Sequence, residues 1–302
     1  MFGEPNFTLT QLRYFVAVSE AGGITEAAKN LLVSQSAVSV AITNLEKQLG
    51  VQLFIRSHAK GVSLTGAGKS FLINARELMS HALELNDFGR DLGDSLTGEL
   101  KIGCFAFIAP FFLPGVLTQF TEKHPLVHLS IAEDHLDGTQ RSLLSGMCDL
   151  ALLYDVNLSP KLHKETIASY PPYALLPEGH RFAGKENLSL ADLQHDPLIL
   201  VDLPNSRDYA VSLARHSGVE QNIAFRASSF EMVRGLVGHG HGYSILNQRP
   251  LVEQTYDGKP LVTKELVGDL PPTSLVLAHV KGTRQSRRAQ AFMEVCREYF
   301  HA

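Results

Sequence analysis

The sequence has few cysteines and no long apolar run, and each shortage excludes a class of protein. Its 302 residues include three cysteines, Cys104, Cys148 and Cys296, which are too few and too scattered for a disulfide framework. They suit a reducing cytosol, where buried thiols behave as small apolar side chains. No stretch reaches the roughly 20 apolar residues of a membrane-spanning helix. The N-terminus also lacks the basic start and apolar core of a secretory signal. We therefore predict a cytoplasmic protein without a membrane partner.

The sequence also has no large excess of charge of either sign. A net charge of −4 argues against a protein that coats nucleic acid, although it leaves room for a local basic patch. Residues 47–76 form such a patch, because they contain no acidic residue and five basic ones: Lys47, Arg56, Lys60, Lys69 and Arg76. The simplest interpretation of this patch is a basic surface exposed to solvent.

A length of 302 residues suggests about two domains.

The patch begins on a helix whose outer face carries almost no charge. Val38, Ile42, Leu45 and Leu49 lie four, three and four residues apart, which predicts a buried stripe on a helix over about residues 35–49. Ser34 is a candidate N-cap for this helix. The opposite face carries mainly short side chains, at Ser36, Ser39, Val40, Thr43 and Lys47. Such a face suits a helix-turn-helix that approaches bases closely, although a plain three-helix bundle would expose a similar surface.

The flanking segments favour the helix-turn-helix. An apolar stripe from Leu9 to Val18 predicts a first helix ended by Gly22 and Gly23, and a short helix from about Glu26 follows Thr25. After the third helix, two short strands near residues 53–56 and 62–64, joined by a turn through Gly61, predict a wing.

Residues 9–68 resemble the winged helix-turn-helix of the LysR-type transcriptional regulators. The resemblance rests on the order and spacing of LTQLRYFVAVSEAGGITEAAKNLLVSQSAVS, LEKQLGVQLFIR and LTGAG. It implies double-stranded DNA as a partner. The DNA-contact positions that it implies are Ser34, Gln35, Ser36, Ser39, Thr43, Arg56 and Lys60. We add Thr25, at the start of the short helix, to this set. The family commonly has proline where this chain has Ser36, and often a basic residue where it has Val40.

The segment after the wing predicts a long helix that joins two chains. A heptad seam runs through Phe71, Ala75, Leu78, Ala82, Leu85, Gly89 and Leu92. Such a seam is typical of a coiled coil, although a single helix packed on its own domain can show part of it. We predict a linker and dimerisation helix over residues 65–95, and a homodimer that assembles into a homotetramer.

From Gly98 onward, strands alternate with helices, which is typical of βαβ units on a mostly parallel sheet. The predicted helices include SLADL, residues 189–193, and crossing strands are expected near 168–172 and 268–273. The layout resembles the effector-binding region of the same family. We predict three parts: a DNA-binding domain over 7–64, the linker over 65–95, and an effector-binding domain over 98–302. Within the last, lobe I takes 98–168 and 272–302, and lobe II takes 169–271.

Ligands of open α/β sheets collect where strands end and helices begin. This rule, applied to both lobes, predicts a site for a small effector, and the helix N-termini favour a carboxylate. The candidate effector-binding residues are Phe105, Ala106, Phe107, Asp134, Leu203, Pro204, Ser206, Arg207, Ser229 and Phe230. Arg207 can clamp a carboxylate or form an ion pair with Asp202 or Asp208. Phe105 and Phe107 can line a pocket or belong to the core.

Other chemistry finds little support in the sequence. His239 and His241 stand two residues apart without a nearby cysteine or carboxylate, which is a weak zinc pattern. No phosphate loop or nucleophile motif is present, so we predict no metal, no cofactor and no enzymatic activity. An α/β enzyme with a DNA-binding head is the alternative, for which Glu133, Asp134 and Asp202 would be the titratable candidates.

Overall fold

The computed structural model describes residues 5–57, 61–90 and 96–301. Its N-terminal part is a three-helix head made of α1 (Leu9–Ala21), α2 (Ile24–Asn30) and α3 (Gln35–Leu49). Ser34 caps α3, because its hydroxyl accepts a hydrogen bond from the Ala37 amide at 3.2 Å. Gly50 ends the helix at a φ of 68°, a backbone conformation that favours glycine. The predicted stripe is confirmed, since Val38, Ile42 and Leu45 are buried in the head.

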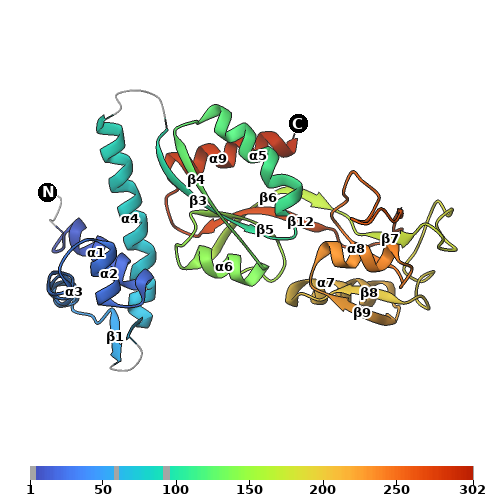
Figure 1. Cartoon of the computed structure of the whole chain (residues 1–302), viewed down its shortest axis with the longest axis horizontal. Helices are drawn as coiled ribbons and strands as arrows, with labels where there is room; N and C mark the ends of the chain where they lie inside the picture. The colour runs from blue at the N-terminus through green and yellow to red at the C-terminus, as the bar shows by residue number, and fades with distance from the viewer. Residues whose placement is uncertain (1–4, 58–60, 91–95, 302) are drawn as a thin grey trace.

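The wing follows α3 as the antiparallel pair β1 (Phe54–Ser57) and β2 (Gly61–Leu64). Gly61 is the first residue of β2 and pairs with Ser57, so its predicted place in the turn is wrong. The long helix α4 (Gly66–Arg90) first lies alongside the head, with Leu72 and Ala75 buried in the core of the head, and then extends beyond it (Figure 1). Thr65 caps it by accepting from the Gly68 amide at 2.9 Å. Leu92 of the predicted seam lies outside the described residues.

The first α/β lobe is built on a five-stranded sheet in the order β4-β3-β5-β12-β6. Figure 1 shows α5 and α9 on one face of this sheet and α6 on the other. The strands are β3 (Gly98–Phe105), β4 (Val127–Asp134), β5 (Leu150–Tyr154), β6 (Leu162–Tyr170) and β12 (Thr273–Val280), and the helices are α5 (Ala109–Lys123), α6 (Leu136–Leu144) and α9 (Arg287–His301).

The second lobe lies between β6 and β12 in the sequence. It contains a parallel pair, β8 (Leu198–Val201) with β9 (Ile223–Ala227), and an antiparallel trio of β7 (Tyr173–Pro177), β10 (Ser244–Leu246) and β11 (Leu261–Glu265). Its helices are α7 (Pro204–Ser217) and α8 (Phe230–Gly238).

Two details of the lobes differ from the sequence prediction. The five-stranded sheet is mixed, because β12 is antiparallel to both β5 and β6. The reason is topological: β6 carries the chain towards the second lobe and β12 brings it back, so these neighbours run in opposite directions. Residues 189–193 form a turn and no helix, since Ser189 and Asp192 close a short loop with side-chain hydrogen bonds.

Candidate DNA-reading surface and effector chamber

The outer face of α3 is exposed and uncharged over its first three turns. Gln35, Ser36 and Thr43 are exposed, Ser39 is half-buried, and Val40 is 59% exposed. The Thr43 hydroxyl donates to the Ser39 carbonyl at 3.0 Å. Because its side chains are short and uncharged, this face of the helix can come close to the base edges of a major groove.

The rest of the predicted DNA-contact set is placed as follows. Thr25 is exposed on α2, and Ser34 is exposed but already caps α3. The backbone of Arg56 belongs to β1, where it pairs with Val62. The side chain of Arg56 and the whole of Lys60 lie outside the described residues.

One member of the basic patch points elsewhere. Lys47 and Lys69 are exposed, whereas the Arg76 side chain is only 13% exposed and forms an ion pair with Glu20 at 2.8 Å. Arg76 also donates to the Ser145 carbonyl of the first lobe. The Arg76 charge is therefore paired within the protein, and the exposed basic patch is smaller than the sequence suggests.

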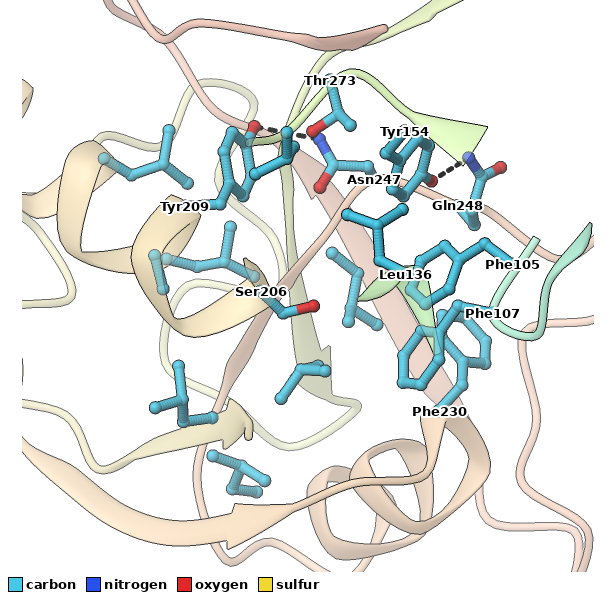
Figure 2. Close-up of a pocket in the computed structure, with 18 of the residues that line it drawn as sticks. Phe105, Phe107, Leu136, Tyr154, Ser206, Tyr209, Phe230, Asn247, Gln248 and Thr273 are labelled. Carbon is cyan, nitrogen blue, oxygen red and sulfur yellow. Dashed lines mark hydrogen bonds between the residues drawn. The ribbon is translucent and has the colours of Figure 1, made fainter. Parts of the chain in front are cut away.

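A cavity of about 70 Å³, hereafter the inner chamber, lies between the two α/β lobes (Figure 2). Many of its lining residues stand at the ends of elements, as expected for a ligand site in an open α/β fold. From the first lobe come Phe105, Phe107, Leu136, Tyr154 and Thr273, and from the second come Ser206, Tyr209, Phe230, Asn247 and Gln248. The Phe105 and Phe107 rings stack at 5.6 Å, and Phe230 meets Phe107 edge-on at 5.9 Å.

The polar groups of the inner chamber are neutral. The Tyr209 hydroxyl donates to the Pro271 carbonyl at 2.8 Å, and the Asn247 amide donates to that hydroxyl at 3.0 Å. Burial raises the pKa of Tyr154 and of Tyr209, so both remain protonated at neutral pH. Ser206 points into the chamber (Figure 2), and its hydroxyl has no hydrogen-bond partner among the described residues. No charged side chain lines the cavity within the described part of the chain.

The N-terminus of α7 supplies positive potential to this neutral chamber. Leu203 is the N-cap and no side chain caps the helix, while Ser206 stands in its first turn. Exposed amide groups at the start of a helix favour an anion. The chamber can therefore accept a molecule with an apolar body and one negatively charged end.

A larger cavity of about 820 Å³, the outer groove, opens beside the chamber and shares Phe107 and Phe230 with it. Of the sequence-predicted effector residues, Phe105, Phe107, Ser206 and Phe230 line the chamber, while Ala106 and Ser229 line the groove. The other three with described side chains line neither cavity. These are Asp134, which accepts from the His135 amide at 2.7 Å; Leu203, which is buried; and Arg207, whose Nε lies 2.8 Å from Asp202. The side chain of Pro204 lies outside the description.

Comparison with known sequences identifies the family to which the chain belongs. The model of the family described as "Bacterial regulatory helix-turn-helix protein, lysR family" matches residues 9–69, and that of the "LysR substrate binding domain" matches residues 93–301. The chain belongs to the LysR family of transcriptional regulators. It is a DNA-binding transcriptional regulator with an effector-binding domain, and its family is one of transcriptional regulators, not of enzymes.

Relatives of this LysR-type chain match it over most of their length. YvbU of Bacillus subtilis, an uncharacterised HTH-type transcriptional regulator, is 28% identical over 98% of this chain and 99% of that protein. The crystal structure of HinK, a LysR family regulator from Pseudomonas aeruginosa, is 41% identical with a TM-score of 0.65, and covers 97% of this chain and 98% of that one. A probable hydrogen peroxide-inducible genes activator of Mycobacterium leprae is 33% identical over 80% of this chain and 78% of that protein.

The cysteines of this LysR-type chain are poorly suited to sensing peroxide. All three are buried. Burial raises the pKa of Cys104 to about 12 and that of Cys148 to about 11, and it also raises the pKa of Cys296. At pH 7 a thiol of pKa 11 is ionised in only about one molecule in ten thousand, and the thiolate is the reactive form.

Hydrogen peroxide is therefore expected to leave operator binding unchanged. Free thiols would be counted, and operator affinity measured, before and after exposure to a dose that oxidises glutathione completely. Retention of three thiols with an unchanged dissociation constant is the expected result. Loss of thiols together with a change in operator affinity would contradict it and would identify a redox sensor.

Within the described residues, no helix is long and apolar enough to cross a membrane, and no three metal-binding side chains cluster. His239 instead pairs with Asp257 at 2.7 Å.

The sequence predicts only a minority of the chamber lining. Its prediction does not include, among others, Leu136, Tyr154, Tyr209, Asn247, Gln248 and Thr273. A signal did exist for two of them, because Tyr154 ends the strand LALLY and Asn247 follows the strand SIL.

Proposed function

We propose that this LysR-type regulator binds its operator through α3 and the wing, and that a small carboxylate-bearing effector in the inner chamber controls that binding. The observation that carries the proposal is the chamber itself. Aromatic walls, neutral polar groups and the uncapped start of α7 converge on one space between the two lobes, together with the Ser206 hydroxyl, which has no partner among the described residues. We also propose that the protein acts in the cytoplasm, where it meets DNA.

The roles of the DNA-contact residues follow from their positions. Gln35, Ser36, Ser39 and Thr43 lie on the exposed face of α3 and are proposed to meet base edges, with Gln35 suited to adenine. Thr25, Ser34, Arg56 and Lys60 are proposed to contact the backbone, where contacts add affinity and register but little sequence preference. The proposed DNA-binding domain is 7–64.

Control by the effector requires the ligand to bind two arrangements of the protein with different affinity. The chamber meets this requirement because both lobes contribute walls, so closing or opening the lobes changes the contacts that a ligand makes. The proposed division is lobe I over 98–168 and 272–302 and lobe II over 169–271, joined to the head by the linker over 65–95.

We propose a homodimer through α4 that pairs into a homotetramer. On α4, Leu78 is 42% and Leu85 is 72% exposed in the single chain, which leaves an apolar seam for a partner. Edge strands β4 and β9 also carry exposed apolar residues, among them Ile131 and Phe225. Unpaired edges of this kind are suited to contacts between effector domains.

The effector site can be tested with a library of small mono- and dicarboxylates, aromatic and aliphatic, screened by thermal shift on the full chain. A bound carboxylate should raise the melting temperature by mass action. Ser206→Ala should weaken the best carboxylate about tenfold, because a hydrogen bond to a charged group is worth about 1.5–3 kcal/mol.

Arg207→Ala is the matched control on the same helix, since Asp202 already holds its guanidinium. It should leave carboxylate affinity within about twofold, the range usual for surface substitutions. Equal affinity of the wild type and Ser206→Ala would place the site elsewhere. A strong loss in Arg207→Ala would return the clamp role to that arginine.

A further inference from the structure

The linker helix α4 is attached to the first lobe of its own chain by polar contacts. The Glu77 carboxylate accepts a hydrogen bond from the Arg284 amide at 2.8 Å. Arg288 donates to the Ser80 hydroxyl at 3.4 Å and to the Thr97 carbonyl at 3.0 Å. Loops 145–147 and 283–286 of the lobe thus meet the middle of α4.

Arg76 is the one residue in this contact shown to bind the head, the linker and the lobe together. Its Nη2 lies 2.8 Å from the Glu20 carboxylate of α1 and 3.1 Å from the Met147 sulfur, while its Nη1 donates to the Ser145 carbonyl. Gly146, at a φ of +71°, lies against the arginine stem, where an added Cβ would stand 3.1 Å from Cδ. The arginine is mostly buried, so these are more than the solvent-screened contacts of a surface ion pair.

The same loop is tied to the inner chamber by α6. Leu136, the first residue of α6, lines the chamber, and Ser145, its C-cap, accepts from Arg76. The nine residues of α6, from Leu136 to Leu144, span roughly 13 Å as a rigid helix. Thr139 is buried and its hydroxyl lies within hydrogen-bond distance of the Cys104 and His135 carbonyls, which fixes α6 to the sheet end beside the chamber.

We propose that Arg76 is a positioning residue that couples the chamber to the DNA-reading head. In the ligand-free chain it holds the head against lobe I, and a displacement of α6 by an occupied chamber reaches α1 through Ser145, Arg76 and Glu20. Arg76 itself leaves Leu78 free, because the two residues are two positions apart and therefore about 200° apart around the helix. The coupling step rests on the proposed effector chamber, whereas the attachment of head to lobe does not.

The attachment is tested by the distance between spin labels on the head and on lobe I of the full-length protein. Lys29→Cys on α2 and Glu122→Cys on α5 give exposed labelling sites, while the native cysteines are buried. An excess of unlabelled protein suppresses distances between protomers. The wild-type head should give one narrow distance. Arg76→Met, which keeps the stem but removes the donors, should replace it with a distribution at least twice as broad and shifted to longer distance.

Arg297→Met is the matched control, because it breaks an arginine–glutamate pair of similar geometry, to Glu165 at 2.6 Å, that lies wholly inside lobe I. It should keep the narrow distance. Glu20→Gln guards against a folding defect, since it weakens the same contact on an exposed residue, and should broaden the distribution in the same direction. An unchanged narrow distance in Arg76→Met, or in Glu20→Gln should Arg76→Met fail to fold, overturns the attachment.

The coupling is tested by filling the chamber with a side chain. Ala210 lines the chamber on α7, so Ala210→Phe occupies it without any ligand. This change should shift the label distance when Arg76 is present and cause no further shift in the Arg76→Met background. No shift in either background, or an equal shift in both, overturns the coupling through Arg76. The carboxylate screen on Ser206→Ala reports on the effector site independently, so failure of the coupling and failure of the proposed function are distinguished.

Discussion

Replacing Leu78 and Leu85 together by aspartate is expected to separate the chains at the proposed α4 interface, which lowers the mass of the assembly, and to reduce operator affinity about a hundredfold or more. Both leucines are exposed on the single chain and lie seven residues apart on one face of α4. In a paired seam each would bury apolar area worth about 2 kcal/mol, and a carboxylate there would be buried without a partner. Chains separated at α4 no longer hold two DNA-binding heads side by side, so they lose the gain from binding two half-sites at once.

Multi-angle light scattering and a titration of a selected operator duplex provide the measurement. Leu251→Asp is the control, because Leu251 is 103% exposed on the second lobe, away from α4. It should keep both the wild-type mass and the wild-type operator affinity. A double aspartate variant of unchanged mass would show that the chains associate through another surface.

Thr43→Glu is expected to reduce operator affinity by about two orders of magnitude, since like charges brought together at an interface cost several kcal/mol. Thr43 is exposed on the uncharged face of α3, which we place against the DNA. A carboxylate at this position would meet the negative potential of the groove and its phosphates. The head should stay folded, because Val38, Ile42 and Leu45 beneath it are untouched.

Thr121→Glu makes the same chemical change on an exposed threonine of α5 and should leave operator affinity unchanged. Fluorescence anisotropy at fixed salt compares the two variants with the wild type. Comparable affinities for Thr43→Glu and the wild type would remove α3 from the groove.

The helices of the head could be predicted from the sequence because the residues that define them are close together in the chain. Ser34 caps the helix that begins one residue later, and the buried stripe of α3 repeats within fifteen residues. Strand β6 was largely missed because only Leu162 and Ile167 of its residues are buried, so its pattern is mostly polar. Strand β10 has only three residues.

The chamber and the Arg76 contact depend on partners that are distant in sequence. Gln248 donates to the Tyr154 hydroxyl across 94 positions, and Arg76 reaches Ser145 across 69. No periodicity records such pairs, so Arg76 was assigned to the basic patch from its charge alone. Arg207 shows the opposite case, because its partner Asp202 is five residues away and was among the alternatives.

The placement of β12 sets an order for synthesis. This strand fills the position between β5 and β6 in the first lobe, yet it starts at Thr273, after the whole of the second lobe has been made. During synthesis on the ribosome, the edges of β5 and β6 that later pair with β12 therefore stay unpaired until more than a hundred residues after β6 have been made. During this interval the head and the second lobe can fold, whereas the first lobe cannot. A chain that stops before β12 would carry a complete DNA-reading head beside an open, aggregation-prone sheet.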